Sequence, residues 1–486
     1  ADVETMYNQH LPLFITASCS FSRFDDFKFS GGEAMMLNDR GGALALISST
    51  RTVYAQPNML LNIELVKDLL AINKESGRIN SIGEVYKLAK NKRAKSSDAN
   101  RLAFILLGDP AIRLAVAETH IAKIDSINGN DVSLDVDTVG ALGKVILKGS
   151  ICSLEDTSTI DNTFNGFVNI IIFDKEEIIE TLCNDAIASD TINNQIPFTY
   201  TYRTNPLFVG NTEVKDGKFV VEFIVPKDIR YNYGAGKIIM YAVDEVQGLE
   251  ANGYSSQMII GGEAKDAIQE DNGPNLKVYL NTPYFKNGDK VDENPVFIAE
   301  LEDISGINTI GSGIGHDIIL RLDNDSKQEY ILNNYYESLL GSYTNGTINY
   351  QLFDLPEGKH KLFFRAWDLQ NNSSSTELEF EVVKDLKPKL NSVYVYPNPV
   401  IDVANIVIEQ DRPLSPFDAQ LYVYDLSGHL ISQENLSVVT DVSNKITIDW
   451  VLKPSMTDGL YFVKVVFIDD NGKKSSKSTK IFVRKQ

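Results

Sequence analysis

Two patterns of hydrophobic and polar residues divide the chain near residue 118. Before that point, short apolar runs that end on small polar residues alternate with segments whose apolar residues recur at helical spacing. After it the helical spacing disappears, and short strand-like stretches are separated by Asn-Gly, Asp-Gly and Glu-Gly turns. The pattern therefore predicts an α/β region followed by all-β, Ig-like sandwich domains.

In the α/β region, three apolar runs are predicted as buried strands: residues 11–17, 41–47 and 104–107. Capping-box spacing predicts helix starts at Ser30-Gly-Gly-Glu33 and at Ser81-Ile-Gly-Glu84. Pro57 is predicted to open a further helix, because the apolar residues after it follow largely helical spacing. Since strands and helices alternate, we predict a parallel sheet that is covered on both faces.

Polar connecting segments divide the β region into three sandwich domains. We predict these domains at residues 118–262, 274–385 and 390–486, after an α/β domain at residues 1–117. The predicted connections are the polar stretch 263–273 and the hinge Asp385-Leu-Lys-Pro388.

The composition is that of a globular protein with an acidic balance. Hydrophobic residues make up 43% of the 486 residues, and the formal net charge is −20. No basic stripe is present to neutralise phosphates, which argues against nucleic-acid binding. No apolar run of 18 or more residues exists, so no membrane-spanning helix is predicted. Because the chain begins without Met or a signal-peptide pattern, we expect Ala1 to be an internal position of a longer protein.

The three cysteines do not form a disulfide framework. Cys152 and Cys183 either pair in an oxidising compartment or are two small core residues. Cys19 stands where the first predicted strand ends, and open α/β sheets bind ligands at the carboxyl ends of their strands. A thiol there is a nucleophile if a histidine activates it, and otherwise an inert buried cysteine.

The α/β region resembles the gingipain-type cysteine peptidases, which have a caspase-like fold. Three segments carry this resemblance: Leu13-Phe-Ile-Thr-Ala-Ser-Cys19 with Phe21 and Arg23-Phe-Asp-Asp26, then Gly32-Glu33 with Gly41-Gly-Ala and Ser49-Thr-Arg51, and Leu107-Gly-Asp-Pro-Ala-Ile-Arg-Leu114. The resemblance implies that this region is the C-terminal part of a caspase-like catalytic domain, with Cys19 as its nucleophile.

The last predicted domain resembles the C-terminal sorting domain of the type IX secretion system. Its three motifs occur in order: Tyr396-Pro-Asn-Pro399, Leu421-Tyr-Val-Tyr-Asp-Leu-Ser-Gly428 and Gly459-Leu-Tyr-Phe-Val-Lys-Val-Val466. We predict motif strands at residues 393–396, 419–426 and 460–467. The terminal segment is rich in lysines, which form either a solvated, protected edge strand or a binding patch: Lys473, Lys474, Lys477, Lys480 and Lys485.

Together these parts resemble the surface sortases of that system, a similarity that extends to Pro226-Lys-Asp-Ile-Arg-Tyr-Asn-Tyr233 and Asp303-Ile-Ser-Gly-Ile-Asn308 with Gly313-Ile-Gly-His-Asp317. The resemblance implies a cysteine endopeptidase and transpeptidase at the cell surface, associated with the outer membrane. Such an enzyme removes sorting domains from cargo proteins and attaches the cargo to anionic lipopolysaccharide. The implied partners are an outer-membrane β-barrel of the PorV type and attachment-complex proteins similar to PorQ and PorZ. The alternative is a degenerate surface scaffold or adhesion protein.

The resemblance also implies the site residues. Cys19 is the catalytic residue, and Tyr54, Ser49, Thr50 and Arg51 are expected at the substrate pocket, with Tyr54 as an aromatic wall. The alternatives are loop packing for Tyr54 and an ion pair with Asp25 or Asp26 for Arg51.

In this family the general-base histidine stands on the preceding strand. Only 18 residues precede Cys19, and His10 lies at the other end of the same predicted strand, about 25–30 Å away at ~3.3 Å per residue. We therefore expect the base to come from an upstream segment, and the 486 residues alone to be inactive. We also expect an exposed sheet edge and apolar surface where that segment belongs.

Four acidic residues invite a Ca²⁺ hypothesis, because hard cations take oxygen ligands: Asp303, Asp317, Asp323 and Asp325. Their spacing fits no EF-hand, and acidic turn residues are the usual explanation. His316 is a possible additional ligand, although a single histidine is more often part of a hydrogen-bonded structure. We predict no metal and no cofactor.

Overall fold

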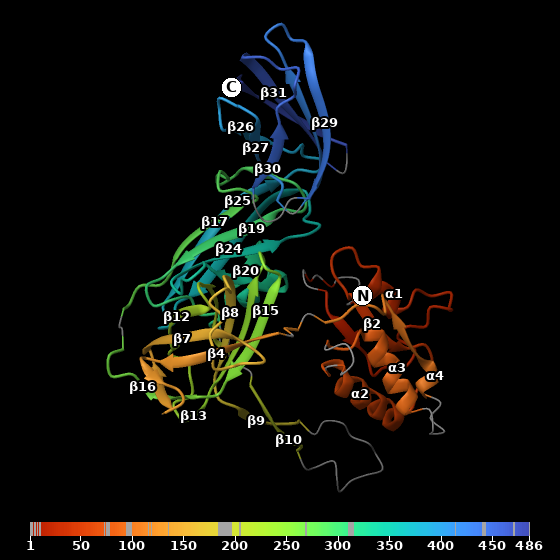
Figure 1. Ribbon diagram of the computed structural model, residues 1–486, viewed down its shortest axis with the longest axis vertical. Coiled ribbons are helices and arrows are strands. Elements are labelled where there is room, and N and C mark those ends of the chain that lie inside the picture. Colours follow the sequence, from red (N-terminus) through yellow and green to blue (C-terminus); the bar gives the residue numbers. More distant parts are fainter. Residues whose placement is uncertain are drawn as a thin grey trace. The chain divides into compact units, whose positions relative to one another are not determined.

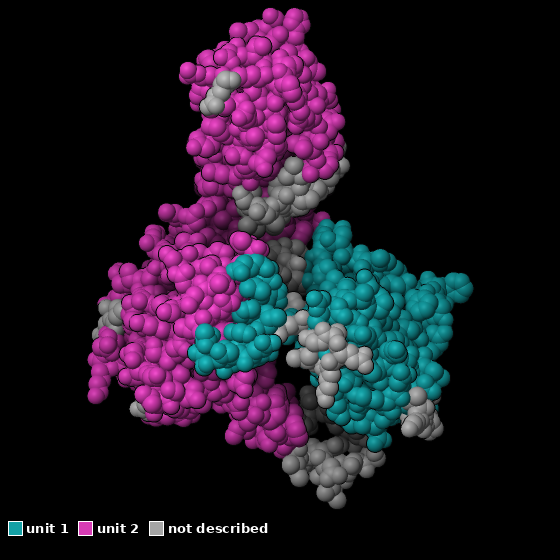
Figure 2. All heavy atoms as spheres, viewed as in Figure 1, with its two compact units in different colours: residues 1–121, 153–159, 247–252 teal, residues 122–152, 160–246, 253–486 magenta. Residues whose placement is uncertain are grey.

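The computed structural model describes residues 3, 6, 8, 11–71, 73, 78–93, 100–114, 116–117, 119–134, 136–182, 197–203, 206–267, 270–309, 315–413, 415–439, 444–469 and 472–485. The chain forms two compact units (Figure 2). The first contains residues 1–121, 153–159 and 247–252, and the second contains residues 122–152, 160–246 and 253–486. In the described part of the chain, the α-helices lie in the red and orange region of Figure 1 and the later regions consist mainly of strands, so the protein is mostly β-sheet.

The α/β part is a three-stranded sheet with four α-helices, and its strand order is β1-β2-β3. Its elements are β1 Leu13–Ile15, α1 Gly31–Met36, β2 Ala45–Ser49, α2 Ala55–Leu69, α3 Ile82–Lys92, α4 Asn100–Ala103 and β3 Phe104–Leu107. Both predicted capping boxes are confirmed, because Ser30 and Ser81 each accept from the backbone of the glutamate three residues on. The helix predicted to open at Pro57 begins two residues earlier, at Ala55.

The prediction of a parallel sheet is wrong for the third strand. β1 and β2 run parallel, but β3 pairs with β2 in the antiparallel sense. The physical reason is that the connection from β2 to β3 contains two packed helices, α2 and α3, before the four-residue α4 leads directly into β3. A single helix would return the chain to the start of the sheet, whereas a second helix carries it back to the carboxyl edge of β2.

The strand lengths also differ from the pattern. β1 contains three residues instead of the predicted seven, and β2 begins at Ala45 instead of Gly41. Leu46 and Ile47 of β2 are fully buried. The central strand therefore carries the core of this small sheet, as its continuous apolar run predicts.

Residues 120–263 form strands of an eight-stranded sheet, a three-stranded sheet and a two-stranded ribbon. The large sheet has the order β11-β8-β14-β15-β4-β7-β12 with β5 beside β4, the small sheet is β13-β16-β6, and the ribbon is β9-β10. Their bounds are β4 His120–Ile127, β5 Asn130–Asp131, β6 Asp137–Ala141, β7 Lys144–Ser153, β8 Gly166–Phe173, β9 Glu177–Glu180, β10 Thr199–Tyr202, β11 Pro206–Val214, β12 Lys218–Ile224, β13 Gly234–Ala235, β14 Lys237–Asp244, β15 Leu249–Ser255 and β16 Met258–Glu263.

Residues 275–382 form two sheets, of order β17-β19-β23-β22 and β18-β25-β24-β20-β21, which share one apolar core. Their bounds are β17 Asn275–Leu280, β18 Lys290–Val291, β19 Val296–Glu302, β20 Ile319–Leu322, β21 Glu329–Ile331, β22 Tyr336–Ser338, β23 Asn345–Gln351, β24 Gly358–Trp367 and β25 Ser373–Val382. Phe297 of one sheet packs against Phe364 of the other, with ring centroids 5.1 Å apart. This arrangement of two facing sheets agrees with the predicted β-sandwich.

Residues 390–483 form sheets of order β26-β27-β30 and β29-β28-β31-β32 around one core that includes Trp450. Their bounds are β26 Leu390–Tyr396, β27 Val403–Gln410, β28 Pro416–Tyr424, β29 Leu430–Val439, β30 Lys445–Val451, β31 Gly459–Asp469 and β32 Lys474–Val483. β26 and β31 contain the predicted strands 393–396 and 460–467. β28 stops at Tyr424, because the Asp425 carboxylate accepts from the N–H groups of Ser427 and His429 and forms a turn.

Of the two other cysteines, Cys152 lies in the described part of the chain. Cys152 is a free cysteine that is fully buried in β7, as expected of a small core residue, and Cys183 lies outside the described residues. Among the described residues, no helix has the length and apolar character needed to span a membrane.

Candidate catalytic site

Cys19 lies on the turn beyond the carboxyl end of β1, as predicted, and its side chain is exposed. Its thiol is held by the main chain of Val53. The Sγ–H donates to the Val53 carbonyl oxygen at 3.4 Å, and the Val53 N–H donates to Sγ at 3.5 Å. The thiol is therefore anchored and accessible, which is the arrangement a nucleophile needs and an inert core cysteine does not have.

Ser49, the last residue of β2, is fully buried beneath the Cys19 turn. Its hydroxyl donates to the Ser18 carbonyl oxygen at 2.5 Å and accepts from the Ser20 N–H at 3.0 Å. The two bonds fall on either side of Cys19. Ser20 itself has a φ of 52°, in the left-handed region that few residues other than glycine adopt.

The next two residues of the predicted pocket face different partners. Thr50 donates to the Ala103 carbonyl oxygen through both its N–H and its hydroxyl, at 2.8 and 2.9 Å. The Arg51 guanidinium forms two hydrogen bonds with the Asp25 carboxylate, of 3.0 and 2.6 Å. This contact lowers the pKa of Asp25 and raises that of Arg51. The ion pair named as the alternative for Arg51 is therefore present, and the pocket role stays a prediction.

Tyr54 precedes the first residue of α2, and its side chain is 75% exposed. Its main chain is clamped by Asn100, which is buried. The Tyr54 N–H donates to Asn100 Oδ1 at 3.0 Å, and Asn100 Nδ2 donates to the Tyr54 carbonyl oxygen at 2.6 Å. Asn100 is a residue of the site that the sequence did not predict. It carries no signal, because it follows a polar stretch and lies 46 residues from its partner.

No histidine contacts the Cys19 thiol within the described part of the chain, where its hydrogen-bond partners are both main-chain atoms of Val53. His10 lies outside the described residues. The remaining histidines contact other groups: His120 contacts Thr119, His316 contacts Asp228, His360 contacts Asp323, and His429 contacts Asp425.

An apolar groove of about 710 Å³ runs along β1 and α2 beside the Cys19 turn. Its lining includes Ile15, Ala17, Met59, Ile63 and Val66. In the described residues β1 pairs only with β2, so its other edge is open. The predicted open edge and exposed apolar surface are thus both found in this region.

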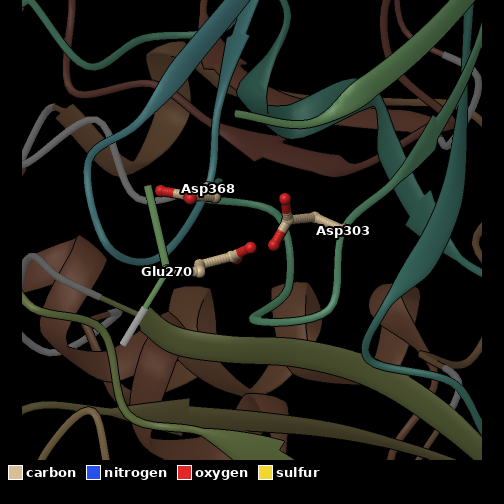
Figure 3. A group of neighbouring side chains, drawn as sticks. All are labelled: Glu270, Asp303 and Asp368. Carbon is tan, nitrogen blue, oxygen red and sulfur yellow. The ribbon is translucent and has the colours of Figure 1, made fainter. Parts of the chain in front are cut away.

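A cluster of three carboxylates lies in the second compact unit: Glu270, Asp303 and Asp368 (Figure 3). Their ligand atoms lie within 4.8 Å of one another, and the two aspartates are buried. Burial raises the pKa of Asp303 to about 6, and Glu270 adds to the shift. Burial also raises the pKa of Asp368.

Of the four acidic residues behind the Ca²⁺ hypothesis, the structure places only Asp303 in this cluster. Asp317 accepts from the Asn333 side chain, Asp323 binds His360, and Asp325 caps a short 3₁₀ helix. Asp303 and Asp368 accept from backbone N–H groups of their own turns, at Ser305 and at Gln370 and Asn372. The cluster is therefore built from two acidic turns and Glu270, and not from the sequence neighbours of His316.

Comparison with known proteins assigns both ends of the chain. Residues 1–115 match the model of peptidase family C25, and residues 394–484 match the model of the secretion system C-terminal sorting domain. No curated protein matches the chain. The chain thus begins with a segment similar to peptidase family C25 and ends with a segment that matches the sorting domain, and the sorting domain indicates secretion by the type IX system and a destination at the cell surface.

Among solved structures, the chain is similar to dimeric latent PorU from Porphyromonas gingivalis, with 29% identity and a TM-score of 0.38. The match covers 92% of this chain and 41% of the PorU chain, so the chain spans less than half the length of that relative. A complex of the RgpB pro- and mature domains from the same organism also matches, with 13% identity and a TM-score of 0.21. That match covers 51% of this chain and 46% of the other.

Proposed function

We propose that the intact protein is a surface sortase: a cysteine endopeptidase and transpeptidase that removes sorting domains from type IX cargo and attaches the cargo to anionic lipopolysaccharide. One observation carries the proposal. The thiol of Cys19 is exposed beyond the carboxyl end of β1, held by the main chain of Val53, in the segment that matches peptidase family C25. The similarity to PorU supports the choice of a sortase.

The proposed reaction begins at Cys19. Its thiolate attacks the peptide carbonyl carbon, the carbon–nitrogen bond breaks, and the amine leaves with a proton from the general base, so that a thioester remains. The Cys19 N–H helps to stabilise the oxyanion. Attack by water then completes hydrolysis, whereas attack by an amine of the glycolipid completes transfer.

We assign the general base to a segment upstream of these residues. Two observations support this assignment. Within the described residues the Cys19 thiol has no histidine partner. The open edge of β1 and the apolar groove along α2 would accommodate a further strand of the same sheet. Such a strand would complete a caspase-like sheet next to the nucleophile.

We propose that Thr50, Arg51 and Tyr54 lie at the mouth of the substrate pocket. The exposed Tyr54 ring, on a main chain clamped by Asn100, is suited to form an aromatic wall.

The domain bounds remain those proposed from the sequence: 1–117, 118–262, 274–385 and 390–486.

The sorting domain is the proposed docking module for a PorV-type partner, and PorQ- and PorZ-like attachment-complex proteins are further proposed partners of the intact protein. Three of its five terminal lysines bind their own chain. Lys473 pairs with Asp385, Lys477 donates to Asn391, and Lys485 donates to Pro454. These contacts favour a protected edge strand over a lysine-rich binding patch.

The test is Cys19→Ala in the full-length protein, with cargo that carries a sorting domain as substrate. We expect release of the sorting domain to be lost while circular dichroism and melting temperature stay unchanged. Cys152→Ala is the matched control, because Cys152 is a buried cysteine remote in sequence from the site, and we expect cargo release to persist. Cargo release that persists in the Cys19 variant would rule out a thiol mechanism here.

A degenerate surface scaffold or adhesion protein is the alternative, and the lack of a histidine partner for Cys19 among the described residues favours it. The full precursor sequence separates the two functions. A histidine beside glycine on the strand that precedes Cys19 supports the sortase, and its absence supports the scaffold.

A further inference from the structure

Ser49 holds the Cys19 turn at three points. Its hydroxyl bonds the Ser18 carbonyl oxygen and the Ser20 N–H, and its own carbonyl oxygen accepts from the Ser22 N–H at 3.0 Å. A serine hydroxyl has one proton to donate and lone pairs to accept, so one side chain satisfies both bonds. Ser18, Ser20 and Ser22 are therefore each hydrogen-bonded to Ser49 at the end of β2.

The two hydroxyl bonds fix the peptide planes on either side of Cys19. The Ser18 carbonyl belongs to the same peptide unit as the Cys19 N–H, and this peptide is trans. In a planar trans peptide the C=O and N–H groups point in opposite directions. Because Ser49 holds the Ser18 oxygen toward the buried end of β2, the Cys19 N–H points away from Ser49.

The Cys19 N–H is left available by this arrangement. Within the described part of the chain it makes no hydrogen bond, whereas the next N–H, of Ser20, bonds both the Ser49 hydroxyl and the Arg51 carbonyl oxygen. The left-handed conformation of Ser20 is rare for a residue with a side chain, and it persists where the surroundings enforce it. Ser49 and Arg51 supply that enforcement.

We propose that Ser49 is a positioning residue, whose buried hydroxyl orients the Cys19 N–H toward the oxyanion of the reacting carbonyl. This inference rests on the proposed function and specifies how that site is built. The predicted role of Ser49 in contacting the substrate is therefore replaced by this positioning role, because a side chain with no exposed surface cannot contact a substrate. The Thr50 bonds to Ala103 keep the end of β2 in place.

β2 offers a matched control for this role. Ser48 is also fully buried, and its hydroxyl bonds the Thr16 hydroxyl at 2.6 Å. It therefore has the same residue type, strand and burial as Ser49, but it contacts the chain three residues before Cys19. Ser48→Ala measures the general cost of deleting a buried hydroxyl from this strand.

The test compares Ser49→Ala, Ser49→Thr and Ser48→Ala in the full-length protein. Cargo cleavage needs the oxyanion donor, whereas alkylation of Cys19 by iodoacetamide does not, because that displacement forms no oxyanion. We expect Ser49→Ala to lower kcat by a factor of about ten or somewhat more. This loss is smaller than the roughly 10²–10³-fold loss of kcat that follows deletion of an oxyanion donor. We expect KM and the alkylation rate to stay within about threefold, and Ser49→Thr to recover most of kcat because it keeps a hydroxyl.

Three results would overturn the inference: unchanged kcat in Ser49→Ala, an equal loss in Ser48→Ala, or an alkylation rate that falls in step with kcat. Hydrogen exchange of residues 18–22 gives an independent reading, because the turn should exchange faster in Ser49→Ala and not in Ser48→Ala. If the wild type cleaves no cargo, the proposed function fails, and unchanged exchange in Ser49→Ala then also overturns the role of Ser49 in holding the turn.

Discussion

The carboxylate cluster of Glu270, Asp303 and Asp368 should make the second compact unit less stable as the pH rises. Burial raises the pKa of Asp303 from 3.8 to about 6, and the neighbouring Glu270 carboxylate acts in the same direction. The folded state therefore binds a proton more tightly than the unfolded state does. The contribution of protonated Asp303 to the unfolding free energy is fully present below about pH 4 and is lost as the pH rises to about 6.

The magnitude follows from the size of the shift. A rise of roughly two pKa units corresponds to at most about 3 kcal/mol at 1.36 kcal/mol per unit. Asp303→Asn removes the ionisation and keeps an oxygen that accepts from the Ser305 N–H. We therefore expect the variant to gain about 1–3 kcal/mol of unfolding free energy over the wild type at pH 7, and little at pH 4.

The assay is urea unfolding at pH 4 to 8 with EDTA present, so that no divalent cation neutralises the carboxylates. A brief hydrogen-exchange pulse at one fixed pH then reads the protection of β19 and β24, whose ends adjoin Asp303 and Asp368. Asp317→Asn is the control, because Asp317 belongs to the same region but not to the cluster. A wild type whose stability does not fall between pH 4 and 6, or an Asp303→Asn variant that is less stable at pH 7, would refute the reasoning.

Three further predictions concern the catalytic segment and the sorting domain. Asn100→Ala should lower the melting temperature and raise KM for cargo in the full-length protein, because the Tyr54 N–H loses its Asn100 acceptor and the Tyr54 carbonyl oxygen keeps only the Asn58 N–H; an unchanged KM would show that the Tyr54 segment does not bind substrate. Residues 1–486 alone should show negligible peptidase activity in a fluorogenic peptide assay, and robust turnover would contradict an upstream base. Deletion from Tyr396 onward should release the protein from the cell or trap it in the periplasm, as measured by cell fractionation; normal surface retention would place anchoring in another domain.

Much of the local structure could be predicted from the sequence because it depends on neighbouring residues. Each capping box joins a serine to a glutamate three residues later, so its spacing alone predicts the helix start. The alternation around Leu421 and Val423 places both side chains in the core of the last sandwich, since strand side chains alternate between faces. The position of Cys19 beyond a strand end follows from the same kind of local pattern.

The features that the sequence did not reveal join residues that are far apart in the chain. The Asn100 clamp on Tyr54 spans 46 residues, and neither residue type announces a partner. The carboxylate cluster likewise brings together three separate segments, of which the sequence analysis singled out only Asp303. Their proximity is a result of packing, and an acidic turn residue looks the same whether or not another carboxylate packs against it.

The sequence by itself determined the element types, the all-β character after residue 118, the sorting motifs and the position of Cys19 beyond a strand end, because each is encoded by side-chain periodicity or by residues a few positions apart. Only the tertiary structure decided the antiparallel direction of β3 and the hydrogen bonds of Ser49 with the Cys19 turn. The direction of β3 depends on how α2 and α3 pack before the chain returns to the sheet. The Ser49 contacts depend on two strand ends that parallel pairing brings together across about thirty residues of intervening chain.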